Sequence, residues 1–265
     1  MIRTIEIRNR DGTVCAARIA GERGNALVFV HGVGSTAAIW DRQLEAFGDR
    51  FRCVAIELRG NGVPKPEPDP ALITRAGYAQ DVLAVCEALS IDRFTIVGCS
   101  LGGVVAFELW TSIPERLRAM VIVGSFAAYP DARAYADSVK GAVRAAGSMV
   151  AFAEQRAGKL GLPADRLRET IEQMCAKCSE SYIAATEATW TGNYTEILPM
   201  IRMPVLVAYG ERDLIAPAAL STVIAEGIPG AHVAAIPDAG HVANADNPVA
   251  FNLLLSEFLT SSVRS

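Results

Sequence analysis

A serine flanked by glycines stands near the centre of the sequence, in the stretch Gly98-Cys99-Ser100-Leu101-Gly102. A short apolar run precedes it, and an apolar run with helical spacing follows. The glycines allow a sharp turn from a buried strand into a helix, which would lift the Ser100 hydroxyl above the sheet edge. The Leu101 N–H would then lie at a helix N-terminus, where negative charge is favoured. The stretch predicts either an exposed nucleophile beside an anion site or a serine N-cap in a tight turn.

A serine nucleophile needs a base, and the chain has three histidines. His232 begins an apolar strand, which favours a structural role, and His31 ends another strand. His241 lies in a polar loop between the last predicted strand and the last predicted helix. Since such a loop stands on the carboxyl side of the sheet, we expect His241 to be the general base. The alternative is a surface histidine.

The base needs an acid that fixes its tautomer and supports the imidazolium. Asp213 follows a buried apolar run directly, so it is expected in the loop at the carboxyl end of that strand. Glu211 is close by, but it stands one step too early. The predicted acid is therefore Asp213.

The elements that must position these residues are strands and helices in alternation. Short apolar runs bounded by turn residues predict strands, and longer runs with a helical period predict helices. The predicted strands are 4–9, 13–20, 26–30, 51–58, 94–98, 118–124, 203–210 and 232–238. The predicted helices are 36–47, 76–91, 101–113, 217–227 and 247–259. The first two strands form a hairpin, and the later alternation implies a mostly parallel sheet with helices on both faces.

One stretch breaks this alternation. Between Ser125 and Arg202 there is no clear strand, and the sequence indicates several helices. We expect an α/β core over 1–125 and 202–265, with a helical cap over 126–201 inserted between two core strands.

Composition limits the function classes. The chain has 265 residues, 51% of them hydrophobic, and a net charge of −4, so it has no basic field for nucleic acid. No signal peptide and no membrane-spanning run is visible, and six scattered cysteines fit a reducing cytoplasm. Cys175 and Cys178 form a C-x-x-C pattern, which we interpret as two helical cysteines rather than a redox or zinc site. We expect no metal, no cofactor, no membrane or nucleic-acid partner, and a monomer or homodimer.

Four motifs together resemble the α/β-hydrolase superfamily over nearly the whole chain except the cap. They are VFVHGVGS, GCSLGG, YGERDLIAP and DAGHVANADNP, and the order Ser100, Asp213, His241 is that of the family. The resemblance implies an α/β-hydrolase fold with a mostly parallel eight-stranded sheet. It also implies an oxyanion hole from the backbone N–H groups of Val33 and Leu101, and a loop-orienting role for His31.

Within the superfamily, the C-terminal stretch and residues 34–47 resemble 3-oxoadipate enol-lactonases. The leading interpretation is a cofactor-free serine hydrolase of a small carboxylic ester or lactone, such as an enol-lactone. Carbon–carbon bond hydrolysis and perhydrolysis use the same triad and stay open. So does a ligand-sensing protein, because residues 77–91 resemble stress-signalling hydrolases and butenolide receptors that use the triad mainly as a sensor.

The cap is expected to carry substrate selectivity. Trp190 and Met149 are the predicted substrate-binding residues, although each could equally be cap core. The mixed charges of the cap stand at helical spacing and predict solvated faces; among them are Arg133, Asp137, Arg144, Glu154 and Arg156.

Overall fold

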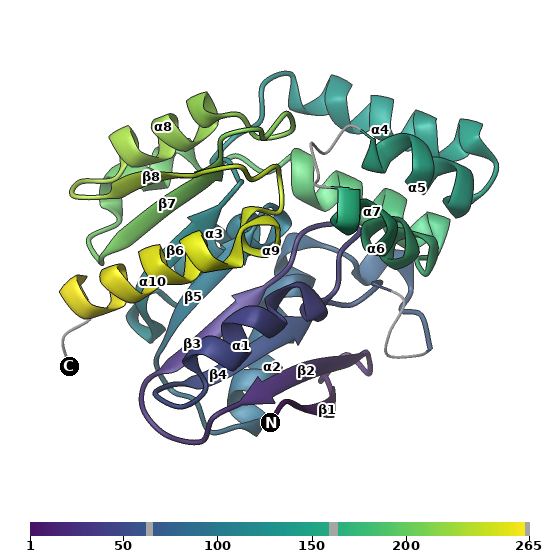
Figure 1. Cartoon of the computed structure of the whole chain (residues 1–265). Helices are drawn as coiled ribbons and strands as arrows, with labels where there is room; N and C mark the ends of the chain where they lie inside the picture. Colours follow the sequence, from purple (N-terminus) through teal and green to yellow (C-terminus); the bar gives the residue numbers. More distant parts are fainter. Residues whose placement is uncertain (62–65, 159–163, 263–265) are drawn as a thin grey trace.

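The computed structural model describes residues 1–61, 66–158 and 164–262. Eight strands form one sheet in the order β1-β2-β4-β3-β5-β6-β7-β8 (Figure 1). Strand β2 pairs antiparallel with β1 and β4, and the other neighbouring pairs are parallel. The strands are β1 (Arg3–Arg8), β2 (Val14–Ala20), β3 (Ala26–Val30), β4 (Arg52–Glu57), β5 (Phe94–Cys99), β6 (Leu117–Val123), β7 (Val205–Gly210) and β8 (His232–Ile236). The predicted mostly parallel eight-stranded sheet is confirmed.

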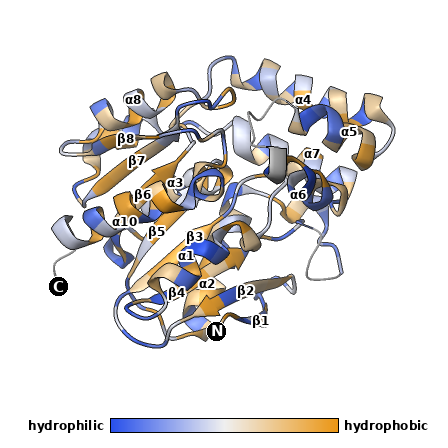
Figure 2. Ribbon diagram, in the orientation of Figure 1, coloured by the Kyte–Doolittle hydropathy of each residue, from blue (hydrophilic) through white to orange (hydrophobic). Residues whose placement is uncertain are grey.

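The helices of the core cover both faces of the sheet. They are α1 (Asp41–Phe47), α2 (Arg75–Ala88), α3 (Leu101–Ser112), α8 (Ala218–Gly227), α9 (Ala243–Asp246) and α10 (Pro248–Ser262). Short 3₁₀ helices lie at Ala37–Trp40, Pro70–Leu72, Pro114–Arg116 and Thr195–Met200. Successive strand residues face opposite sides, so in β3 Val28 packs towards α2, α3 and α8, whereas Phe29 packs towards α1 and α10. Continuous apolar strands are therefore needed, and Figure 2 shows them as the most hydrophobic part of the molecule.

The parallel register brings the ends of neighbouring strands to one edge. Val30 at the end of β3 is paired with Gly98 near the end of β5, and Cys99 is paired with Val123 at the end of β6. The loops that follow these strands, and the loops after β7 and β8, therefore meet above the same edge of the sheet.

Four further helices, here named the cap helices, lie between β6 and β7. They are α4 (Ala132–Ala146), α5 (Met149–Ala157), α6 (Ala164–Cys175) and α7 (Ser179–Trp190). They have a buried apolar cluster of their own, which includes Val143, Phe152 and Tyr182. Figure 1 shows these helices beyond the edge of the sheet where the strand ends meet.

One expectation needs correction, and the exposure of His232 adds to another. Cys178 is not helical: it is the exposed residue that precedes α7, and only Cys175 ends a helix. His232 begins β8 as expected, but β8 is the edge strand and His232 is exposed. An edge strand has one unpaired side, which explains why its first residues face solvent.

Candidate active site

Ser100 occupies a strained turn between β5 and α3. Its backbone angles are φ +53° and ψ −112°, a region that residues with a side chain rarely adopt. The Ser100 N–H donates to the Val123 carbonyl at 2.9 Å, and the Ser100 carbonyl accepts from the Ser125 hydroxyl at 2.7 Å. Bonds on both sides of the residue hold it in this conformation, as is usual for strain stored at functional sites.

The glycines around Ser100 are required by close backbone approach. A Cβ on Gly98 would lie 2.1 Å from the Gly102 carbonyl oxygen, and a Cβ on Gly102 would lie 2.1 Å from the Val30 carbonyl oxygen. A Cβ on Gly32 would lie 3.1 Å from the Cβ of Ser100 itself. The turn therefore packs tightly against the end of β3, and the Ser100 side chain is 2% exposed.

His241 and Asp213 extend a chain of hydrogen bonds from the Ser100 hydroxyl. The Nε2 atom of His241 lies 3.0 Å from the Oγ atom of Ser100. The Nδ1 atom lies 3.0 and 2.9 Å from the two carboxylate oxygens of Asp213. With Nδ1 donating to Asp213, Nε2 is free to accept the serine proton. The three predicted residues therefore lie together in the geometry of a nucleophile, a base and an orienting acid.

The Asp213 carboxylate is fixed by more than the histidine. Its Oδ1 atom accepts from the N–H groups of Ile215 and Ala216 at 2.8 and 2.9 Å. The other candidate acid, Glu211, is exposed and lies towards the Asp238 N–H, 3.4 Å away. The structure thus brings Asp213, and not Glu211, to the imidazole.

The two N–H groups predicted for the oxyanion hole are unpaired. Val33 follows β3 and lines the pocket over Ser100, and Leu101 is the first residue of α3. Within the described part of the chain, neither backbone N–H has a hydrogen-bond acceptor. His31 lies beneath this loop, fully buried, with Nδ1 2.8 Å from the Gly32 carbonyl and Nε2 accepting from the Leu58 N–H at 3.2 Å. These bonds fix the loop that carries Val33.

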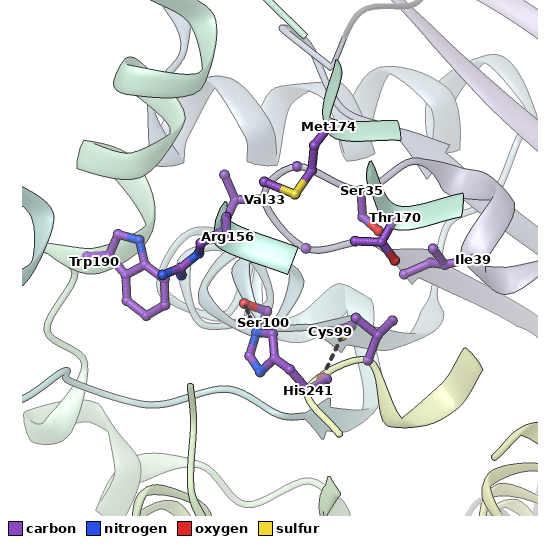
Figure 3. A pocket seen from close by; sticks show the side chains of 13 residues that line it. Val33, Ser35, Ile39, Cys99, Ser100, Arg156, Thr170, Met174, Trp190 and His241 are labelled. Atoms are coloured by element: carbon purple, nitrogen blue, oxygen red, sulfur yellow. Dashed lines mark hydrogen bonds between the residues drawn. The ribbon is translucent and has the colours of Figure 1, made fainter. Parts of the chain in front are cut away.

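Cys99 lies beside the active site, but its surroundings do not favour a reactive thiolate. Its thiol lies 3.9 Å from the His241 carbonyl oxygen and lines the pocket (Figure 3). Burial raises the pKa of this thiol, so Cys99 is the protonated form at neutral pH.

Above the serine lies a pocket closed by the cap helices. Ser100 and His241 form its floor, Trp190 and Arg156 lie on one side, and Met174 lies above (Figure 3). The space inside is about 30 Å³, enough for a water molecule and too small for a substrate. A substrate therefore requires the residues that line the pocket to rearrange.

The structure places the two predicted substrate-binding residues differently. Trp190 lines the pocket, but Met149 lies in the apolar cluster of the cap helices, where it packs with Val143 and Phe152. Met174, on α6, takes the place in the pocket that was expected of Met149. Which apolar face of a cap helix meets the core depends on the packing of the helices, which periodicity does not specify.

Two charged residues at the site escaped the sequence analysis. Arg156 was expected on a solvated face, yet it is half-buried and lines the pocket, whereas Arg133, Asp137, Arg144 and Glu154 are exposed as expected. The C-terminal half of α5 packs against the pocket, and this contact buries the arginine.

The second is Asp246, five residues after the base. Its Oδ2 atom accepts from the Gly240 N–H at 3.0 Å, and its Oδ1 atom lies 3.8 Å from Nε of Arg166 on α6. Burial raises the pKa of Asp246 to about 6. The sequence shows an acidic residue shortly after His241, which could have drawn attention to Asp246. It gives no sign that this carboxyl is buried.

Among residues 1–61, 66–158 and 164–262, no group of three or more His, Cys, Asp or Glu side chains is arranged to hold a metal ion. No helix in these ranges is long and apolar enough to cross a membrane.

The chain is similar to proteins named as a carbamate hydrolase, an enol-lactonase and an esterase. It is 29% identical to a protein named putative carbamate hydrolase RutD from Azorhizobium caulinodans, over 89% of this chain and 91% of the relative. The enol-lactonase structure from Burkholderia xenovorans superimposes with a TM-score of 0.88 at 25% identity, covering 97% of this chain and 100% of the other. The thermophilic esterase from Thermogutta terrifontis superimposes with a TM-score of 0.84 at 27% identity, covering 98% and 99%.

The family model for the alpha/beta hydrolase fold matches residues 25–248, which contain all three residues of the hydrogen-bonded chain. Together with the sheet order, the strained serine turn and the relatives, this match shows that the protein belongs to the α/β-hydrolase superfamily, with enol-lactonase-like relatives.

Proposed function

We propose that this hydrolase cleaves small carboxylic esters or lactones through an acyl-enzyme on Ser100. The observation that carries the proposal is the continuous hydrogen-bonded chain from the Ser100 hydroxyl through His241 to Asp213. The relatives named as enol-lactonase and esterase support the substrate class. Each of these substrates presents a carbonyl carbon bonded to an oxygen leaving group.

In the first half of the reaction, the Ser100 Oγ attacks the carbonyl carbon while His241 Nε2 takes the hydroxyl proton. The carbonyl oxygen becomes an oxyanion and accepts from the N–H groups of Val33 and Leu101, which have no other acceptor within the described chain. When the intermediate collapses, the bond to the leaving oxygen breaks and His241 returns the proton to that oxygen. The alcohol leaves, or in a lactone stays attached to the acyl group.

In the second half, a water molecule replaces the alcohol. His241 takes a proton from the water, whose oxygen attacks the acyl carbon, and then returns the proton to Ser100. The free acid is released. Asp213 stays bonded to Nδ1 throughout and stabilises the imidazolium in each half. The reaction uses only side chains, backbone N–H groups and water.

We also propose that residues 126–201 form a cap that excludes water and shapes the pocket, with Trp190 among the residues that contact substrate. The cap helices close the space above Ser100, which supports this role.

A panel of p-nitrophenyl esters from acetate to octanoate, together with simple lactones and enol-lactones, tests the proposal. We expect many turnovers per molecule on at least one substrate, and loss of turnover in Ser100→Ala. A ligand sensor on the same fold would give only a few turnovers and a ligand-dependent rise in melting temperature. Turnover that survives in Ser100→Ala contradicts the proposed nucleophile.

A further inference from the structure

Arg156 is a cation in the catalytic pocket without an anion to neutralise it. Its guanidinium donates to the Tyr135 hydroxyl at 3.1 Å and lies over the Tyr135 ring, with its Cζ atom 5.9 Å from the ring centre. It forms no ion pair with any residue that the structure describes, although the cap carries several carboxylates. An arginine stays charged at any physiological pH and has five N–H donors, so most of its donors are unused here.

A second unused donor lies in the same pocket. Trp190 is 1% exposed, and its Nε1–H has no acceptor within the described chain. The indole is locked in place by Phe126, Tyr129 and Tyr135, whose ring centres lie 5.1, 4.7 and 4.6 Å from its own. A buried donor without an acceptor is unfavourable in the folded state. The buried Trp190 N–H and the unused N–H groups of the half-buried Arg156 line the same pocket beside one reactive serine, which indicates a ligand that accepts from both.

Arg156 lines both the catalytic pocket and a second space, and its position between them is here named the junction. An outer cavity of about 480 Å³ is bounded by α4, α5 and the loop after β7, and Arg156 lines both spaces. Leu214 on its rim is 72% exposed, so the cavity reaches the surface. Apart from Arg156, the described residues that line the outer cavity are apolar or uncharged. Arg156 is therefore the only charged residue among the described residues that line the outer cavity.

We propose that the substrate carries a carboxylate besides its scissile ester or lactone, and that Arg156, with the Trp190 N–H, binds that carboxylate at the junction. This inference rests on the proposed hydrolysis at Ser100 and narrows it to monoanionic acyl substrates. A guanidinium binds a carboxylate through paired, charge-assisted hydrogen bonds, each stronger than a neutral one. Arg156 is thus a specificity-determining residue.

The kinetic test uses two esters with the same leaving group. The mono-p-nitrophenyl ester of glutaric acid carries a free carboxylate, and p-nitrophenyl pentanoate is its neutral counterpart. We expect wild type to favour the anionic ester in kcat/KM. The ratio of the two kcat/KM values should fall at least tenfold in Arg156→Gln, since hydrogen bonds to charged groups contribute about 1.5–3 kcal/mol. Arg156→Lys, which keeps the charge, should retain part of the ratio.

The matched control is Arg168→Gln, which removes the same charge from an exposed position on α6. It should leave the ratio unchanged. A wild-type ratio of one or less, a smaller fall in Arg156→Gln, or an equal fall in the control overturns the carboxylate site. Turnover of the neutral ester in those cases leaves the serine mechanism intact, so the two failures are distinguishable.

A binding test needs neither catalysis nor a substitution at Arg156. In Ser100→Ala, monomethyl glutarate should raise the melting temperature in a saturable manner, whereas uncharged dimethyl glutarate at the same concentrations should not. An equal rise with both esters, or none with monomethyl glutarate, overturns the proposal.

Discussion

The two walls of the catalytic pocket differ in how their polar groups are partnered. On the core wall, the Ser100 hydroxyl, both ring nitrogens of His241 and both carboxylate oxygens of Asp213 have a partner within 3.0 Å, and the donors left unpaired among the described residues are the backbone N–H groups of Val33 and Leu101. On the cap wall, the Trp190 N–H has no acceptor in the described chain, and Arg156 donates to one neutral hydroxyl. Paired groups are held ready for one reaction, whereas unpaired donors favour a ligand. The core wall therefore suits chemistry and the cap wall suits recognition.

Removal of the general base on the core wall should have the largest effect on kcat. We expect His241→Ala to lower kcat by about 10⁴–10⁶ on every ester, because the Ser100 proton then has no acceptor. The control is His232→Ala, at the exposed start of β8, which should stay within twofold of wild type. The measurement is kcat on the p-nitrophenyl esters from acetate to octanoate, and a loss confined to some of them contradicts the assignment.

Removal of the orienting acid should have the second-largest effect on kcat. Asp213→Asn should lower kcat by about 10³–10⁴, because the amide favours the wrong histidine tautomer while it can still accept from Ile215 and Ala216. Glu211→Gln serves as the neighbouring control and should change kcat less than threefold. If Asp213→Asn stays within a few-fold of wild type, another acid orients His241.

A substitution on the cap wall should alter the preference among acyl groups more than it alters kcat. Trp190→Phe keeps an aromatic ring beside Phe126 but removes the N–H, so we expect the preferred acyl group to shift, with a change of about tenfold in relative kcat/KM. Trp190→Ala should shift the preference further, at a cost of about 3–5 kcal/mol in unfolding free energy. If folded Trp190→Phe loses all turnover, the indole is required for the reaction itself. That result would contradict the separation of catalysis on the core wall from substrate preference on the cap wall.

One contact crosses between the two regions, and the effect predicted for it is on stability rather than on turnover. Burial raises the pKa of Asp246 to about 6 in the folded state, from about 3.9 in an unfolded chain. Below about pH 3 the carboxyl is largely protonated in both states. As the pH rises to 6 only the unfolded state loses the proton, so the folded state becomes less stable by up to about 3 kcal/mol.

Asp246→Asn should therefore gain unfolding free energy relative to wild type between pH 4 and 6, and keep that gain above pH 6. The amide oxygen can still accept from Gly240. Urea melts at pH 4, 5, 6 and 8 measure the difference. A difference that does not depend on pH contradicts the raised pKa.

The sequence predicted the core wall well because its residues follow local rules. Ser100, Asp213 and His241 each stand just past an apolar run, and parallel strands bring such positions to one edge whatever the details of packing. Val33 was predicted from the resemblance to the α/β-hydrolase superfamily, and it lines the pocket over Ser100. The eight strands were predicted because both faces of the sheet are buried, which requires continuous apolar runs.

The cap wall was predicted less well because helix packing decides it. Met149 and Met174 are both apolar residues on cap helices, and only the angle between helices decides which one meets the core. Arg156 has the helical spacing of a surface charge, yet its helix turns it inward beside Tyr135. No local pattern separates these outcomes, so Arg156 and Met174 were identified as pocket-lining residues only from the structure.

The central claim is that Ser100 is the one activated nucleophile of this chain. A fluorophosphonate probe, followed by peptide mass spectrometry, tests it directly. We expect a single labelled peptide carrying the probe on Ser100, no labelling in Ser100→Ala, and labelling slowed sharply in His241→Ala. Labelling of another residue, or none in folded wild-type protein, contradicts the claim.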